Sequence, residues 1–134
     1  MTFFDTNVLV YAIINQDSAK QQLAEKLIED AIASRQLKIS PLVLTELTFV
    51  LAKLGQLPSQ NELLQYFQKF STPSIDRIDI ARAIKIALEM GMGKSINDLV
   101  HLVHAEHQCC AKIVTFDRGF SRFAGQTDLE LVLL

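Results

Sequence analysis

The segment Thr2-Phe3-Phe4-Asp5 opens the chain with an apolar run that ends at an acid, and this pattern decides the fold that we predict. Apolar residues resume at Asn7–Tyr11. A short apolar run before a polar break is typical of a buried strand, here with Asp5 at its C-terminal edge. Lys112–Phe116 repeats the pattern near the other end of the chain and ends at Asp117. If the two strands are neighbours in a parallel sheet, both acids emerge at the same edge.

Helical periodicity describes most of the chain between these two strands. In Ser18–Ala33 apolar residues recur at intervals of three and four, and Ser40-Pro41 is a strong start signal for a helix that runs to Leu54. Further helices are expected from a capping box at Ser59 and Glu62 to about Phe70, over Ile80–Met90, and from Ser95 towards the cysteines. The other elements are short strands at Leu37–Ile39 and Leu129–Leu134, a strand or extended link at Ile75–Ile78, and a turn at Arg118–Phe120. Strands that alternate with helices predict an α/β fold with right-handed crossovers and a parallel sheet covered on both faces.

The composition predicts one globular domain and excludes several classes of protein. At 134 residues the chain has room for a single domain, residues 1–134, and 49% hydrophobic residues supply a core. The net charge of −2 excludes a polybasic binder of nucleic acid or of a membrane surface. Cys109 and Cys110 are adjacent and therefore poorly placed for a disulfide, which favours a reducing cytoplasm. No signal peptide or membrane span is predicted.

Four acids are distinguished by their local setting. Asp5 and Asp117 stand at strand ends, Glu46 lies inside an apolar helix, and Asp98 is in the first turn of a helix. Asp98 reaches the same sheet edge if its helix begins over that edge. Carboxylates about 5 Å apart without Lys or Arg partners repel by roughly 3 kcal/mol per pair, so a cation is required. Oxygen ligands without thiolate or imidazole favour Mg²⁺ or Mn²⁺, and such a site supports hydrolysis of phosphodiester bonds.

Each of these acids also has an ordinary structural explanation. Asp5 is able to cap the chain after its strand, and Asp117, before an Arg-Gly pair, is a natural turn residue. Glu46 is able to extend from its helix into solvent. Asp98 follows Ser95 at the spacing of a capping box, and an acid in the first turn also favours the helix dipole.

The histidines suggest a zinc site that the pattern does not support. His101, His104 and His107 recur every three residues and precede the two cysteines. Positions at this spacing fan around a helix, and no second cluster of ligands accompanies them, so zinc is disfavoured. The helix after Ser59 carries apolar residues that are typical of core and have an interface as their alternative role, namely Leu63, Leu64, Phe67 and Phe70.

Four segments resemble, in order, the motif blocks of PIN-domain ribonucleases: Phe4–Val10, Ser40–Leu47, Ile96–Ala105 and Ile113–Phe120. The blocks span essentially the whole chain with all four acidic positions filled, and their order and the chain's size resemble VapC-type toxins of bacterial toxin–antitoxin pairs. The resemblance implies a three-layer α/β/α sandwich and metal-dependent endoribonuclease activity. It also implies catalytic roles for Asp5, Glu46, Asp98 and Asp117, with Asp5, Asp98 and Asp117 on the metal, and supporting roles for Asn7 and Thr115, which orient carboxylates. His101 and His104 depart from the apolar or small residues common at their positions, a departure that we expect to leave the acids unaffected.

The resemblance further implies the cofactor and the partners. The cofactor is Mg²⁺ or Mn²⁺, and the expected partners are an RNA substrate, a cognate antitoxin and a second copy in a homodimer, in the cytoplasm. Cleavage would leave a 5′-phosphate and a 3′-hydroxyl. Because the chain as a whole is acidic, the candidates for holding RNA are a few local cations: Lys94, Arg118 and Arg122.

Two other functions share some of these features. A catalytically silent module of the same fold, which docks a partner or holds RNA, would carry the same residues, and only activity separates it from the enzyme. A phosphoacceptor switch domain also gathers acids at strand ends of a parallel sheet. Glu46 within a helix has no role in such a domain, so this function is disfavoured.

Overall fold

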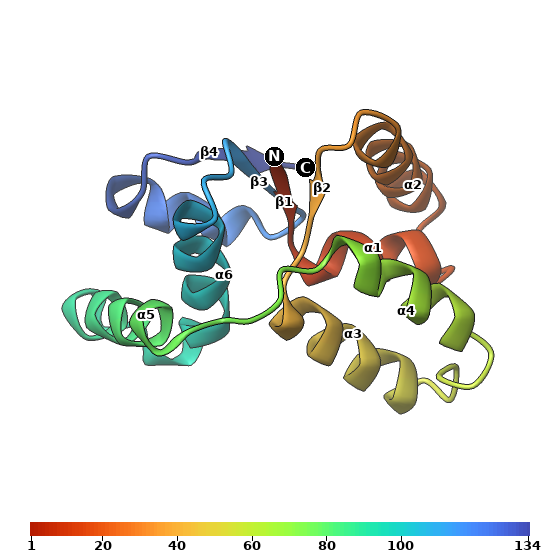
Figure 1. The fold of residues 1–134 in the computed structure, drawn as a ribbon, viewed down its shortest axis with the longest axis horizontal. Helices are drawn as coiled ribbons and strands as arrows, with labels where there is room; N and C mark the ends of the chain where they lie inside the picture. The colour runs from red at the N-terminus through yellow and green to blue at the C-terminus, as the bar shows by residue number, and fades with distance from the viewer.

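Four short parallel strands form the middle layer of the protein, whose structure is a computed structural model of residues 1–134 (Figure 1). The sheet has the order β2-β1-β3-β4, with β2 at Leu37–Lys38, β1 at Thr2–Phe4, β3 at Lys112–Thr115 and β4 at Glu130–Leu133. β1 and β3 are neighbours, and Phe4 pairs with Val114 in parallel register. The carboxyl ends of these two strands therefore lie side by side, as the sequence predicts.

Helices cover both faces of the sheet. One side carries α1 (Thr6–Ile13), α2 (Ser18–Ala33), α3 (Pro41–Lys53) and α4 (Asn61–Phe67), and the other carries α5 (Arg77–Met90) and α6 (Ile96–His107) (Figure 1). Short 3₁₀ segments complete the chain: η1 (Gln68–Phe70), η2 (Gly93–Ser95) and η3 (Arg118–Gln126). The predicted three-layer α/β/α sandwich with a central parallel sheet is confirmed.

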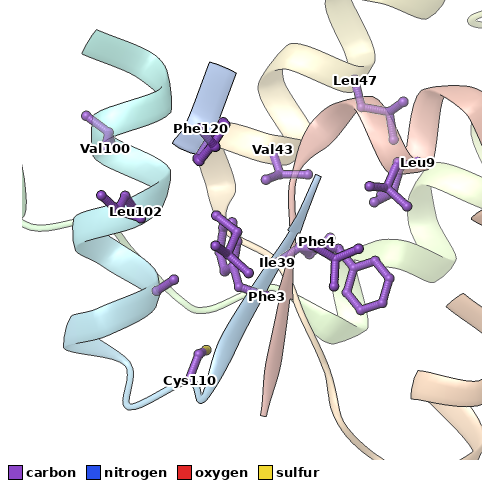
Figure 2. Packing of buried hydrophobic residues seen from close by; sticks show 14 of the residues in the cluster. Phe3, Phe4, Leu9, Ile39, Val43, Leu47, Val100, Leu102, Cys110 and Phe120 are labelled. Atoms are coloured by element: carbon purple, nitrogen blue, oxygen red, sulfur yellow. The ribbon is translucent and has the colours of Figure 1, made fainter. Parts of the chain in front are cut away.

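The core lies on both faces of β1. Phe3 and Phe4 are fully buried and point to opposite sides, because successive side chains alternate along a strand (Figure 2). Phe3 points towards α6, where its ring lies 5.8 Å from that of His101, and Phe4 points towards Leu9 of α1. Through these two side chains β1 packs against the helices on both faces of the sheet.

The apolar residues of Asn7–Tyr11, which the sequence pattern does not assign to an element, lie in α1. The chain turns at Asp5, whose side chain accepts a hydrogen bond from the backbone N–H of Thr6 and caps the helix. A short apolar run has no periodicity that separates a strand from a buried helix. The cap decides for the helix, and the helix buries Val8 and Leu9.

Several boundaries also differ from the expected ones. The capping box at Ser59 is absent: the Ser59 hydroxyl donates to the carbonyl of Gln56, and Gln60 precedes α4 without a side-chain cap. Part of Ile75–Ile78 belongs to α5, which Asp76 caps. The turn expected at Arg118–Phe120 is the start of the longer segment η3. No helix combines the length and the apolar character needed to cross a membrane.

Candidate active site

The four acids predicted from the sequence line one cavity of about 730 Å³. Asp5 and Asp117 follow the adjacent strands β1 and β3, Glu46 comes from the middle of α3, and Asp98 from the first turn of α6. The N-terminus of α6 therefore does lie over the carboxyl edge of the sheet. Residues that are distant in the sequence share one surface hollow because of this placement.

Asp5 is almost fully buried at the base of this group, with 5% exposure. One carboxylate oxygen accepts from the backbone N–H of Thr6 and the other from the hydroxyl of Thr115, each at 2.7 Å. Burial raises the pKa of Asp5 above its ordinary value, although the charge of His101 and these two hydrogen bonds favour the ionised form. Two hydrogen bonds thus hold the Asp5 carboxylate in place, and neighbouring groups offset only part of the cost of burying its negative charge.

Thr115 and Asn7 form a short relay behind Asp5. The Thr115 hydroxyl donates to Asp5 and accepts from the side-chain amide of Asn7 at 3.0 Å. Asn7 in turn accepts from the backbone N–H of Phe116 at 3.0 Å. Thr115 therefore contacts a carboxylate directly, whereas Asn7 contacts none and acts through Thr115. The relay ties the start of α1 to the end of β3.

Glu46 is anchored by three donors. Its Oε1 lies 2.6 Å from both the hydroxyl of Thr6 and Nε2 of His101, and its Oε2 accepts from the Asn97 amide at 3.1 Å. These contacts lower the pKa of Glu46: burial alone would raise it, but the hydrogen bond and charge of His101, with Thr6 and Asn97, outweigh that effect. Glu46 is an ionised, oriented side chain of the cavity wall and does not extend freely into solvent.

His101 belongs to the acidic group, which corrects our expectation that the histidines leave the acids unaffected. The ring is buried, and its Nε2 lies 2.6 Å from Glu46 and 3.7 Å from Asp5, while Nδ1 has no hydrogen-bond partner. Burial alone would lower the pKa of His101, but the Glu46 hydrogen bond and the charges of Asp5, Glu46 and Asp98 raise it. The imidazole is thus a direct partner of the acids, and these acids favour its positively charged form.

Asp98 is half-buried, and its charge is opposed both by burial and by its acidic neighbours. Burial raises its pKa from 3.8 to about 6, with further upward contributions from the charges of Asp5, Asp117 and Glu46 that the charge of His101 opposes. The capping-box explanation is wrong, because Ser95 makes no side-chain cap bond at the start of α6, whereas Asp98 does lie in the first turn, where an acid favours the helix dipole. Asp98 therefore faces its fellow acids without a structural contact that accounts for it.

Asp117 is held by the backbone that follows it. Its Oδ1 accepts from the N–H of Gly119 at 2.8 Å, and its own N–H donates to the hydroxyl of Thr115 at 2.9 Å. A Cβ at position 119 would lie 2.8 Å from that carboxylate oxygen, which is closer than carbon and oxygen normally approach. Glycine at position 119 is what permits Asp117 this orientation.

The donor set of the cavity fits a hard divalent cation. Asp5, Asp98 and Asp117 offer only carboxylate oxygens, which Mg²⁺ and Mn²⁺ prefer, and Nε2 of His101 is engaged by Glu46. The oxygens of the three acids do not all lie within 4.8 Å of one another, as expected for like charges, which repel. Burial, together with the charges of Asp5, Asp117 and Glu46, raises the pKa of Asp98, so a cation bound here would favour its ionised form.

Comparison with known proteins shows which family this chain belongs to. The model of the PIN domain matches residues 2–126. The chain belongs to the PIN domain family. VapBC2 from Rickettsia felis bound to a DNA fragment from its promoter shares the fold, with 21% identity and a TM-score of 0.70 over 99% of this chain and 98% of that chain. A toxin–antitoxin complex from Klebsiella pneumoniae shares it with 22% identity and a TM-score of 0.66 over 97% and 96%. No curated protein matches the sequence.

Sequence reasoning missed three residues of this PIN domain site, namely Thr6, Asn97 and His101, all of which hold Glu46. A signal existed for His101, since it follows Asp98 by three residues and therefore shares its face of the helix. The signals at Thr6 and Asn97 are weaker, because short polar residues next to an acid are common at helix starts.

The other two histidines of the PIN domain serve the packing of α5 on α6. Asp79 of α5 is buried, with Nδ1 of His104 and Nδ1 of His107 each 2.7 Å from its carboxylate. Nε2 of His104 also lies 2.8 Å from the hydroxyl of Thr72. Asp76, Asp79 and His107 bring ligand atoms within 4.8 Å, but Asp76 also caps α5 and Asp79 joins the two helices. Those contacts explain the cluster, and the three histidines do not converge on a common point.

Proposed function

We propose that this PIN domain is a Mg²⁺- or Mn²⁺-dependent endoribonuclease. The observation that carries the proposal is the convergence of Asp5, Glu46, Asp98 and Asp117 on one open cavity, where burial, with the charges of the other three acids, raises the pKa of Asp98 to about 6. Structural acids are dispersed or paired with cations, whereas these share a single hollow. Membership of the PIN domain family supports a nuclease function in general.

Asp5, Asp98 and Asp117 would hold the metal, and Glu46 would act beside it. A bound divalent ion supplies an activated water and neutralises charge on the scissile phosphate. Glu46 is kept ionised by its three donors, so its carboxylate is ready to accept a hydrogen bond from a water in the cavity. Thr115 orients Asp5, and Asn7 holds Thr115. The chain's own residues thus fix the acids before substrate binds.

We also propose that the protein is the toxin of a toxin–antitoxin pair in the cytoplasm, with homodimerisation as the assembly to test. The fold likeness to VapBC2 and to the Klebsiella complex supports this. A mostly apolar groove of about 440 Å³ between α2 and α4, lined in part by Ile28, Leu63 and Phe67, offers a place for an apolar antitoxin segment. Of the four apolar residues considered for an interface, Leu64 and Phe67 are buried in the core.

The deciding experiment is cleavage of a mixed RNA pool by purified protein with Mn²⁺ or Mg²⁺, beside EDTA and the variant Asp5→Ala. Asp128→Ala is the matched control, since Asp128 is an exposed acid outside the cavity. We expect metal-dependent cutting by wild type and by Asp128→Ala but not by Asp5→Ala. Absence of cutting by folded, antitoxin-free, metal-loaded protein would favour the alternative, a catalytically silent module that docks a partner or binds RNA.

A further inference from the structure

A large aromatic side chain stands exposed at the cavity that holds the acids. Phe49 of α3 is 67% exposed, yet it lines the same cavity as Asp5 and Glu46. It follows Glu46 by three residues, so the two side chains lie on neighbouring positions of one helix face. Burial of the core does not require Phe49 there, and its position beside the acids calls for another explanation.

A second aromatic ring enters the cavity from α1. Tyr11 is half-buried and lines the cavity, and its ring packs at 4.7 Å on that of Phe116. Nζ of Lys20 lies 4.8 Å above the Tyr11 ring and donates to its hydroxyl at 3.4 Å. Tyr11 is thus held in a fixed orientation, whereas the Phe49 ring makes no aromatic contact with another side chain of the protein.

The charge of the cavity disfavours binding through phosphates alone. Four carboxylates line it, and no Lys or Arg is among the lining residues. For a polyanion at this surface, positive charge comes only from a bound metal and from basic residues outside the cavity lining. Stacking of a nucleobase on an aromatic ring does not depend on net charge, so it is a means of holding a polyanion here.

We propose that Phe49, with Tyr11 in the same cavity, stacks on an unpaired nucleobase next to the scissile phosphate. This inference rests on the proposed function and deepens it, because it names the side chain that holds a base beside the scissile phosphate. A base inside a duplex has both faces covered by its neighbours, so it cannot lie on Phe49. Phe49 is then a specificity-determining residue that binds the RNA strand next to the scissile phosphate.

A fluorescence titration tests the contact directly, because the chain contains no tryptophan. Phe49→Trp places a single reporter at the cavity, and Ca²⁺ in place of Mg²⁺ occupies an oxygen-ligand site during binding. The probes are single-stranded homopolymeric RNAs of about eight nucleotides and a ribose–phosphate oligomer of equal length without bases. We expect the RNAs to quench the tryptophan and the abasic oligomer to leave its emission unchanged. Equal quenching by the abasic oligomer would overturn the proposal.

Steady-state cleavage supplies the second readout. Phe49→Ala is expected to raise KM for single-stranded RNA by about 5- to 100-fold with a much smaller change in kcat, while Phe49→Tyr retains the wild-type KM. Leu54→Ala is the matched control, since Leu54 is 50% exposed just after α3 but does not line the cavity.

The outcomes separate this inference from the proposed nuclease. Cleavage by wild type with an unchanged KM in Phe49→Ala overturns the stacking role and leaves the nuclease intact. Quenching by RNA but not by the abasic oligomer, in a protein that cuts no RNA, supports base binding and overturns the nuclease. A change of oligomeric state in Phe49→Ala, with unchanged RNA binding, would assign Phe49 to a protein interface and overturn the proposal.

Discussion

Asp98 shows how a single residue reports on the whole site. Its pKa of about 6 in the folded chain exceeds the ordinary 3.8, because burial and three neighbouring carboxylates oppose its charge. A folded-state pKa above the unfolded one means that the folded protein holds its proton more tightly. The metal-free protein therefore loses stability as pH rises through the window between about 4 and 6, and a bound cation removes this loss.

We predict that Asp98→Asn raises the free energy of unfolding of the metal-free protein at pH 7 by about 1–2 kcal/mol, a value reduced for the partial exposure of the side chain. Mg²⁺ should then stabilise wild type more than the variant. Urea denaturation at pH 4 and pH 7, with and without Mg²⁺, measures both effects, with Asp128→Asn as the exposed control. A variant less stable by more than about 1 kcal/mol, with equal stabilisation by metal, would contradict this assignment.

His101 tests whether Glu46 needs its buried partner. His101→Leu should lower the cleavage rate by about tenfold or more, because Glu46 loses a donor at 2.6 Å and with it a fixed orientation. Stability should also fall, because the substitution removes one partner of a buried contact and leaves the carboxylates of Glu46 and Asp5 without their imidazole. His101→Gln restores a donor and should recover part of the rate. Equal rates for wild type and His101→Leu, measured as kcat, would show that Glu46 keeps its place without the imidazole.

At the scale of elements, the site is made by the junctions that follow β1 and β3. The β1–α1 junction turns at Asp5, and the β3–η3 junction turns at Asp117, with Thr115 bonded to both acids. Short junctions restrict the backbone more than long loops do, so the acids are held by hydrogen bonds of the main chain as well as by packing.

The β3–η3 junction depends on Gly119. We predict that Gly119→Ala weakens metal binding and slows cleavage several-fold, because a Cβ would press within 2.8 Å of the Asp117 carboxylate and turn it away. Gly125→Ala in the same segment is the control, since nothing lies within 4 Å of a Cβ there. Calorimetric titration with Mn²⁺ compares the two variants, and equal affinities would show that Asp117 is not a ligand or that the junction adapts.

The contact between α5 and α6 is separate from the cavity that holds the four acids. Asp79→Ala should destabilise the protein by about 2–4 kcal/mol, because it leaves the buried ring of His104 without its carboxylate partner. Cleavage per folded molecule should persist, since Asp79 does not line the cavity of the acids. Thermal unfolding beside the exposed control Glu89→Ala measures the loss. A loss of activity without a loss of stability would instead assign this cluster a role in the reaction.

At the scale of the whole molecule, the charge distribution limits how RNA is held. The net charge is −2 and the cavity is acidic, so we propose the exposed Lys94, Arg118 and Arg122 as the residues that contact phosphate. Three cations predict a shallow dependence of affinity on salt, with a slope of about −2 for log K against log salt on single-stranded RNA. Filter binding between 50 and 300 mM salt, roughly the range over which counterion release is seen, measures the slope. A slope steeper than about −4 would reveal a further basic surface.

The sequence by itself determined the layers of this protein and the strand-end positions of two of its acids. Local periodicity identified the buried strands and most of the helices, and residue type placed Asp5 and Asp117 at strand ends. The tertiary structure alone decided three other matters: the helical state of Asn7–Tyr11, the pairing of His101 with Glu46, and the exposure of Phe49 beside the acids. The reason is physical. Propensity and pattern act over a few neighbouring residues, whereas the contacts of the site join residues 55 and 110 positions apart, which become neighbours only when the sheet and its helices assemble.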